Sequence, residues 1–161
     1  MIRSATVADA EPIADIYNHY VSDTTVTFEE APVEPAEMAA RIESVLSKEL
    51  PWLVYEDAGE VLGYAYASPW SPRSAYRYTV EASAYLAPTA VGRGVGSALF
   101  GALFDGLRAA GIKVVLSRIA LPNPASVALN EKFGFTKVGH LSEVGMKFGQ
   151  WLDVGIWQRR L

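Results

Sequence analysis

Cysteine is absent from the 161-residue chain, so disulfide bonds, thiolate zinc sites and a thiol nucleophile are excluded. The sequence also lacks an apolar run of about 18 residues, the length that a membrane-spanning helix needs. Its first residues do not have the charge and apolar pattern of a secretory signal peptide. Histidine is scarce, with two residues in total, and neither belongs to a metal-binding pattern such as His-x-x-x-His. We therefore expect a cytoplasmic protein that binds neither a membrane nor a metal ion.

An excess of positive charge is missing too. There are 14 Lys and Arg residues against 18 Asp and Glu, which gives a formal net charge of −4, and the charges are scattered along the chain. This balance argues against general nucleic-acid binding. Hydrophobic residues make up 50% of the sequence, which is enough for one sizeable core. We expect a single domain over residues 1–161.

Glycine is concentrated in one short stretch, Val-Gly-Arg-Gly-Val-Gly-Ser at residues 91–97. An apolar run, 82–87, precedes it, and an amphipathic run, 98–104, follows, so the predicted order is strand, loop and helix. Glycines let another group approach the backbone closely. The first turn of a helix also leaves N–H groups unpaired at the positive end of the helix dipole. The stretch therefore predicts a seat for a phosphate or pyrophosphate group.

Hydrophobic periodicity predicts alternating strands and helices along the rest of the chain. The predicted strands are 2–5, 52–56, 61–68, 79–87, 113–119, 136–142 and 147–158. Four helices are predicted. The first begins near Asp9 and the second at Pro35, the third covers residues 94–110, and the fourth covers residues 125–133. The last two strands are expected to turn around Gly145. Together these elements predict an α/β or α+β sheet with helices on both faces.

Two familiar phosphate-binding motifs do not fit the glycine stretch. A dinucleotide-binding fold places its glycines near the start of the domain, with an acidic residue about 20 positions later. Here the stretch lies past the middle, and residues 113–121 contain no acid. A P-loop ends with Gly-Lys-Ser or Gly-Lys-Thr, whereas Gly96-Ser97 has no lysine. A tight turn without any ligand remains the structural alternative.

The stretch resembles the cofactor motif of the GNAT N-acetyltransferases, Gln/Arg-x-x-Gly-x-Gly/Ala. Downstream, Asn123-x-x-Ser126 and then 131–135, Glu-Lys-Phe-Gly-Phe, resemble the second signature of that superfamily. The resemblance covers nearly the whole chain. It implies acetyl-CoA as a co-substrate and a mixed, mostly antiparallel sheet of about seven strands flanked by about four helices.

Three further stretches resemble phosphinothricin acetyltransferases and the enzymes that acetylate methionine sulfoximine and methionine sulfone. They are residues 70–76, residues 79–81 and the C-terminal residues 145–158. This resemblance implies that the acceptor is the α-amino group of a small amino acid or analogue. It also implies a homodimer in which the final strands and the acceptor loops meet.

The resemblance assigns the cofactor to the strand around Leu86, the glycine stretch and the second signature. The expected cofactor-binding residues are Tyr85, Leu86, Ala87, Val91, Gly92, Arg93, Gly94, Val95, Gly96, Ser97, Asn123 and Ser126. Two positions depart from the superfamily pattern. Val91 replaces the usual Gln or Arg, for which Arg93 can supply charge. Asn130 stands where many members have a tyrosine general acid, so the coenzyme thiolate is expected to leave as the anion.

Glu81 is the expected general base, because the acceptor amine arrives mostly as an ammonium and must lose a proton. It lies in an otherwise apolar strand, where a carboxylate needs a function or a partner. Arg73 is the candidate partner of the acceptor's acidic end, since a guanidinium binds such groups bidentately. The other expected substrate-binding residues are Phe28, Ala75, Tyr76 and Lys147. An outward-facing glutamate and a solvated loop arginine are the alternatives.

Three functions remain open at this point. The first is direct acetyl transfer to a small amino acid in a ternary complex. The second keeps the fold but uses a protein N-terminus or a polyamine as acceptor, although a polyamine site would require several acids and Arg73 favours an anionic acceptor. The third is an acyl-CoA-binding module without activity, which the departures at Val91 and Asn130 keep open.

Overall fold

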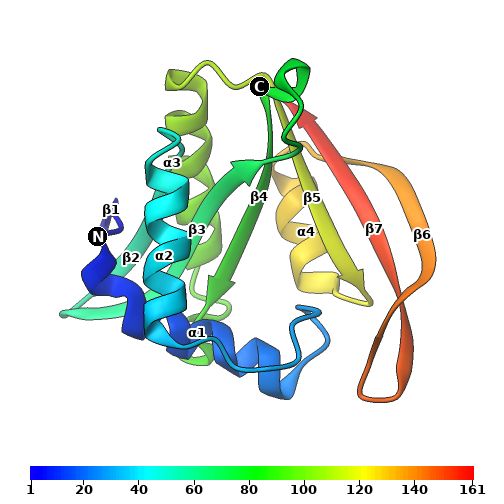
Figure 1. The fold of residues 1–161 in the computed structure, drawn as a ribbon, viewed down its shortest axis with the longest axis horizontal. Coiled ribbons are helices and arrows are strands. Elements are labelled where there is room, and N and C mark those ends of the chain that lie inside the picture. Colours follow the sequence, from blue (N-terminus) through cyan, green and yellow to red (C-terminus); the bar gives the residue numbers. More distant parts are fainter.

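The computed structural model describes residues 1–161, which form one seven-stranded mixed sheet (Figure 1). The strands are β1 (Ile2–Ser4), β2 (Trp52–Asp57), β3 (Glu60–Pro69), β4 (Thr79–Leu86), β5 (Val114–Leu121), β6 (Thr136–Lys147) and β7 (Gln150–Arg160). Their order in the sheet is β1-β2-β3-β4-β5-β7-β6. All neighbours are antiparallel except β4 and β5, which are parallel. The expected mixed, mostly antiparallel sheet is confirmed.

Four α-helices cover the two faces of the sheet (Figure 1). They are α1 (Ala10–Asp23), α2 (Pro35–Leu46), α3 (Val95–Ala109) and α4 (Pro124–Lys132). The first two pack on one face, against β2, β3 and β4, while α3 lies on the opposite face and α4 packs beside β5. None of the helices has the length and apolar character that crossing a membrane requires.

Helix α3 is held by an apolar stripe with a spacing of four residues. Val95, Leu99, Leu103 and Leu107 are all buried and belong to a contiguous core cluster of 32 residues. Burying each leucine contributes on the order of 1.5–3 kcal/mol to folding. Gly111 follows the helix with a φ of +77°, a conformation that glycine adopts without a Cβ penalty. The stripe orients the helix so that its start, with the glycine stretch, lies at the lower end of β4 (Figure 1).

The parallel strands β4 and β5 pair over only part of their length. Residues 79–81 pair with residues 114–116, and no pairing continues beyond Glu81 and Leu116. Figure 1 shows the two strands separating below this point. The hydroxyl of Ser117 donates to the carbonyl of Ala82 across the upper edge of the opening, at 3.3 Å. Backbone polar groups alternate sides along a strand, so those of Ala84 and the N–H of Leu86 also face the gap, while the Leu86 carbonyl accepts from the Tyr20 hydroxyl at 2.6 Å.

The turn of the final hairpin differs from the prediction. Strand β6 continues through Gly145, which pairs with Leu152, and the turn lies at Phe148 and Gly149. The expected turn at Gly145 is therefore wrong. The ring of Phe28 packs against this glycine, and a Cβ at residue 145 would lie 2.2 Å from it, so any other residue would displace the ring. Close packing of the two segments, not a change of chain direction, accounts for this glycine.

Candidate active site

The gap between β4 and β5 is a cavity that opens through the sheet. Its walls come from both strands, from the start and body of α4, from Phe100 of α3 and from Val26 of the connection between α1 and α2. They are Val26, Ala82, Ser83, Ala84, Tyr85, Phe100, Ser117, Arg118, Ile119, Ala120, Asn123, Ser126, Leu129 and Asn130. Three of the expected cofactor residues, Tyr85, Asn123 and Ser126, thus lie around one cavity.

The glycine stretch forms a bare backbone loop before α3. Gly92 and Gly94 have φ values of +78° and +81°, and Gly94 is the N-cap of the helix. The first hydrogen bond of the helix joins the Ala98 N–H to the Gly94 carbonyl. The N–H groups of residues 95–97 precede this bond and have no carbonyl within the helix. An added Cβ at Gly92 or Gly94 would meet no atom within 4 Å, so this backbone is open to a ligand.

Two asparagines lie on the α4 side of the gap. The side-chain oxygen of Asn123 accepts from the Ser126 N–H at 3.2 Å, so it caps α4 as an Asx turn would. Asn130 is 3% exposed, and its amide donates to the Ser126 carbonyl at 2.8 Å. Its side-chain oxygen has no partner. A buried acceptor without a partner costs about 1–3 kcal/mol, and a donor in the gap, such as a pantetheine amide, would offset this cost. The lining therefore fits the coenzyme.

The charges near the glycine loop are not distributed as the sequence suggested. Arg93 forms an ion pair with Asp57 of β2, at 3.5 Å, and both side chains are more than half exposed. Lys132, at the end of α4, donates to the hydroxyl of Ser97 at 2.9 Å. This lysine therefore places a positive charge beside the start of α3. It was not among the expected site residues, although it lies within the second GNAT-like signature.

A second cavity, of about 410 Å³, lies on the face of the sheet that α1 covers. Its lining is Val26, Thr27, Phe28, Glu81, Ser83, Tyr85, Arg118, Ala120, Leu141, Val144 and Val154. Five of these residues also line the gap: Val26, Ser83, Tyr85, Arg118 and Ala120. Ligands in the two cavities would therefore meet at a shared wall.

Glu81 lies in this second cavity, but it is not a free carboxylate. Its side chain is 17% exposed and pairs with Arg118 of β5. The guanidinium donates to both carboxylate oxygens, with Nη2 3.1 Å from Oε1 and Nε in closer contact with Oε2. The carboxylate raises the pKa of Arg118. Arg118 was missed in the sequence, although it is the only charge in the apolar run 114–121.

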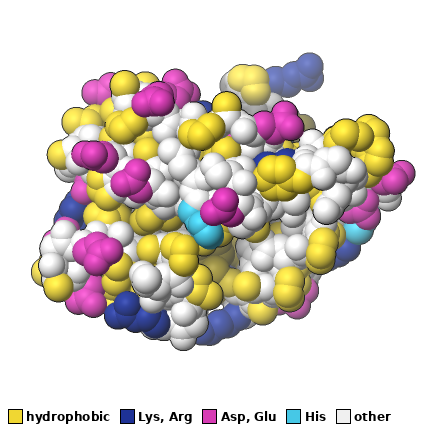
Figure 2. All heavy atoms as spheres, turned by 90° about the horizontal axis from the view of Figure 1, so that it is seen from below, with side chains coloured by type: hydrophobic (Ala, Val, Ile, Leu, Met, Phe, Trp, Pro, Cys, Tyr) yellow, Lys and Arg dark blue, Asp and Glu magenta, His cyan; other side chains and the backbone are white.

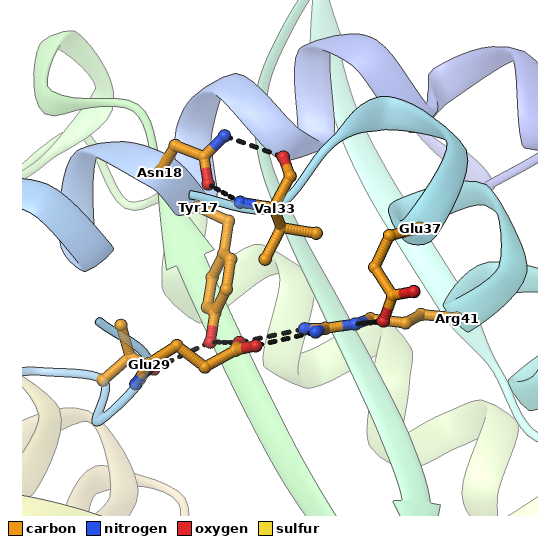
Figure 3. A network of polar contacts seen from close by, with 7 residues as sticks. Tyr17, Asn18, Glu29, Val33, Glu37 and Arg41 are labelled. Carbon is orange, nitrogen blue, oxygen red and sulfur yellow. Dashed lines mark hydrogen bonds and ion pairs between the residues drawn. The ribbon is translucent and has the colours of Figure 1, made fainter. Parts of the chain in front are cut away.

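The loop between α1 and α2 covers the second cavity and is held by a polar network (Figure 3). Arg41 donates to both carboxylate oxygens of Glu29, at 2.9 and 2.7 Å. The hydroxyl of Tyr17 donates to Glu29 as well. Asn18 and the Val33 backbone exchange two hydrogen bonds, at 2.9 and 2.7 Å. The guanidinium holds the pKa of Glu29 below its usual range. These contacts fix the loop segment that carries Phe28.

Lys147 supports the same loop from below. The residue is 1% exposed, and its ammonium donates to the carbonyls of Thr27 at 2.8 Å and Tyr20 at 3.5 Å. Burial lowers its pKa. Of the two expected substrate-binding residues in this region, Phe28 lines the cavity, whereas Lys147 lies beneath the loop and does not line it.

The other three expected substrate-binding residues are not brought to Glu81. Arg73, Ala75 and Tyr76 lie on the connection between β3 and β4, at the upper end of Figure 1, and all three are exposed. Arg73 lines a different cavity. None of the three lines the cavity that contains Glu81.

Replacing Arg41 by glutamine is expected to raise KM for the acceptor about two- to fivefold, since a half-exposed ion pair contributes on the order of 0.5–1 kcal/mol. The loop that carries Phe28 would lose its anchor on α2, while the affinity for acetyl-CoA would stay the same. Steady-state kinetics and calorimetry measure the two effects. Glu37→Gln is the matched control, because it removes a neighbouring partner of Arg41 and leaves the pair with Glu29 intact.

The same pair predicts a pH dependence. Because the folded-state pKa of Glu29 is lowered, its ion pair stabilises the protein fully above the ordinary glutamate pKa. The contribution is lost as the pH falls through the lowered value. The difference in melting temperature between the wild type and Arg41→Gln should therefore shrink on acidification from pH 7. A difference that persists in strong acid would contradict this role of Glu29.

Taken together, the site has two compartments with one shared wall. One is a gap between parallel strands, with unpaired helix N–H groups at its foot that suit a diphosphate. The other is the cavity on the face of the sheet that α1 covers, which contains the carboxylate of Glu81. This arrangement suits an enzyme that transfers a group from a coenzyme to a second substrate bound beside it.

The comparison with known families names that enzyme class. The Acetyltransferase (GNAT) domain matches residues 2–156, and the chain belongs to the GNAT acetyltransferases. It is an N-acetyltransferase that uses acetyl-CoA. The expected recognition, fold and co-substrate are confirmed, and the interpretation as a binding module without activity is set aside.

Individual relatives agree with this assignment. Phosphinothricin N-acetyltransferase of Streptomyces viridochromogenes is 44% identical over 158 residues, which is 98% of this chain and 86% of the relative. The L-methionine sulfoximine/L-methionine sulfone acetyltransferase of Pseudomonas aeruginosa is 41% identical over 161 residues, 99% of this chain and 94% of the relative. A phosphinothricin acetyltransferase from Sinorhizobium meliloti, solved with acetyl-CoA, has a TM-score of 0.97 at 40% identity and covers 100% of this chain and 88% of its own.

Proposed function

We propose that the protein transfers the acetyl group of acetyl-CoA to the α-amino group of a small amino acid, of the phosphinothricin, methionine sulfoximine or methionine sulfone type. The observation that carries the proposal is the cavity of about 410 Å³ that holds Glu81 and shares a wall with the coenzyme gap. Its volume suits an amino acid with a short side chain. The names of the relatives support the same acceptor class.

On the donor side, the N–H groups of residues 95–97 and the ammonium of Lys132 would hold the pyrophosphate. The backbone of Ala84 and Leu86 would pair with the pantetheine arm, and an N–H near Leu86 would hold the thioester oxygen. Such an oxyanion donor contributes about 3–4 kcal/mol to lowering the barrier. Acetyl-CoA supplies the acetyl group and a thiolate that leaves with the electron pair of the broken C–S bond. We retain all the expected cofactor-binding residues in this proposal.

On the acceptor side, Glu81 would take a proton from the ammonium of the amino acid. The neutral amine can then form the new C–N bond, and its remaining excess proton goes to the departing thiolate. Holding the two reactants at the shared wall can contribute roughly 7–11 kcal/mol. Asn130, which replaces the tyrosine of many family members, cannot donate a proton as an acid. Its unpaired oxygen can instead accept from a donor in the gap.

The cavity distinguishes the proposed acceptor from the second candidate class. Glu81 is the only carboxylate in its lining. A polyamine carries several positive charges and would require several acids, whereas this lining combines one acid, one arginine and apolar walls. A small zwitterionic amino acid matches that combination better than a polycation does.

We further propose that residues 1–161 form one domain, and that the protein works in the cytoplasm as a homodimer. Its activity would protect cells from amino-acid analogues that act as antibiotics or herbicides. The support for the dimer is the set of exposed apolar side chains on β6 and β7, at the right of Figure 2, of which Leu141 and Val144 also line the acceptor cavity. The set comprises Val138, Leu141, Val144, Met146, Phe148 and Trp151. Exposed patches of this kind mark protein interfaces.

Release of free thiol from acetyl-CoA, measured against a panel of amino acids and their oxidised analogues, tests the proposed function. We expect turnover with phosphinothricin, methionine sulfoximine or methionine sulfone, and little turnover with spermidine or with a peptide that has a free N-terminus. A clear preference for spermidine or the peptide would overturn the proposed acceptor class. Absence of turnover with the whole panel would overturn the proposal altogether.

A further inference from the structure

Arg118 is the only cationic side chain in the lining of the acceptor cavity, and the function proposed above assigns it no contact with a particular group of the acceptor. The other charged residue of the lining is Glu81. The cavity therefore contains one opposite pair of charges among otherwise polar or apolar walls. Arg118 also lines the coenzyme gap, so it lies at the wall where the two substrates would meet.

The two members of the pair differ in their freedom to move. Glu81 has a short side chain that is 17% exposed, on a strand paired on both sides. Arg118 is 58% exposed, and its guanidinium lies over the ring of Trp70 at 5.6 Å from the centroid. A long exposed arginine can change its rotamer at little cost. Arg118 is therefore the mobile partner.

The ion pair occupies both oxygens of the residue that has to act as base. The guanidinium of Arg118 donates to Oε1 and Oε2 of Glu81. An ammonium that approached Glu81 alone would have to compete with this bidentate contact and leave Arg118 without its anion. An acceptor that carries both an ammonium and a nearby carboxylate can satisfy both charges at once, with its ammonium on Glu81 and its carboxylate on Arg118.

We propose that Arg118 binds the carboxylate of the acceptor and that this binding releases Glu81 to act as the base. One ion pair within the protein is exchanged for two ion pairs with the acceptor, so the site selects amines that have a neighbouring carboxylate. The inference rests on the proposed function. It assigns to Arg118, in the cavity itself, the anion recognition for which the sequence offered Arg73.

The test compares two acceptors in the wild type and in Arg118→Gln. The acceptors are methionine sulfone, which has a single carboxylate, and its methyl ester, which keeps the amine and loses the charge. With Arg118→Gln, we expect kcat/KM to fall about 10- to 100-fold for the acid, as for loss of a charged bidentate contact, and not to fall for the ester, because the ester ammonium no longer competes with Arg118 for Glu81. Both acceptors are used with both proteins, so the lower basicity of the ester amine cancels. Arg118→Lys should retain part of the preference for the acid, as a point charge without the fork.

Two further variants complete the experiment. Arg108→Gln removes an exposed charge on α3, paired with Asp105, and should leave both acceptors unaffected. Arg73→Gln tests the competing assignment. The inference is overturned if Arg118→Gln lowers kcat/KM equally for the acid and the ester, which would indicate a structural role. It is also overturned if Arg73→Gln, rather than Arg118→Gln, abolishes the preference for the acid over the ester. The wild type could acetylate methionine sulfone while Arg118→Gln keeps the same preference for the acid over the ester. That result would contradict this inference alone, and the proposed function would stand.

Discussion

Replacing Glu81 by glutamine is expected to lower kcat/KM for the amino-acid acceptor by about 10²–10⁴-fold at neutral pH, the usual contribution of a positioned base. Glutamine keeps the shape of the side chain but does not accept a proton from the acceptor ammonium. The affinity for acetyl-CoA should be unchanged, because Glu81 lines the acceptor cavity and not the coenzyme gap. The loss should shrink as the pH rises toward the pKa of the acceptor's own amine, which then deprotonates without help.

Thiol release over a pH series and calorimetry with acetyl-CoA measure the two halves of this prediction. Glu60→Gln, at the exposed first residue of β3, is the matched control and should behave as the wild type. An unchanged rate at neutral pH in Glu81→Gln would remove Glu81 from the mechanism. Equal loss of turnover and of coenzyme affinity would mean that the substitution disturbs the sheet rather than the proton transfer.

Replacing Gly94 by alanine is expected to weaken binding of coenzyme A and acetyl-CoA by at least about 5- to 30-fold. The N-cap of α3 has a φ of +81°, a left-handed conformation that costs an L-residue with a Cβ about 1–2 kcal/mol of conformational free energy. The loop can avoid this strain only by changing the backbone that presents the N–H groups of residues 95–97. KM for the amino acid should change little, since Gly94 does not line the acceptor cavity.

Gly101→Ala makes the same change seven residues further along α3 and serves as the control. Gly101 has no positive φ, and an added Cβ would meet no atom within 4 Å. Alanine should therefore raise the free energy of unfolding by about 0.5–1 kcal/mol and leave coenzyme binding intact. Calorimetry and denaturant unfolding distinguish the two variants. Unchanged affinity in Gly94→Ala would mean that the glycine loop does not hold the coenzyme.

Most of the secondary structure could be predicted because its signals are local. The stripe of Val95, Leu99, Leu103 and Leu107 predicted α3, and the glycines before it predicted a helix start with open backbone. The error at Gly145 has the same origin. A glycine between two strand-like segments indicates a turn, whereas here it lies within β6 and packs against the ring of Phe28, which is distant in the sequence.

The site residues also divide into those with a local signal in the sequence and those whose role depends on distant segments. Glu81 was recognisable as a charge in an apolar strand, and Arg118 carried the same signal in the next parallel strand without being noticed. Lys147 looked like a residue of the pocket, yet it is buried under a loop and donates to the carbonyl of Thr27 there, 120 positions earlier in the chain. Such roles depend on which segments meet and cannot be read from neighbouring residues.

By itself, the sequence determined the coenzyme side of this enzyme, because a glycine loop and the helix after it are built from consecutive residues. Only the tertiary structure decided the acceptor side, where Glu81 meets an arginine 37 residues away. That meeting requires β4 and β5 to be parallel, in register at their upper ends and separated below. The pairing of two strands joined by a helix depends on how the whole core packs, and no short stretch of sequence contains it.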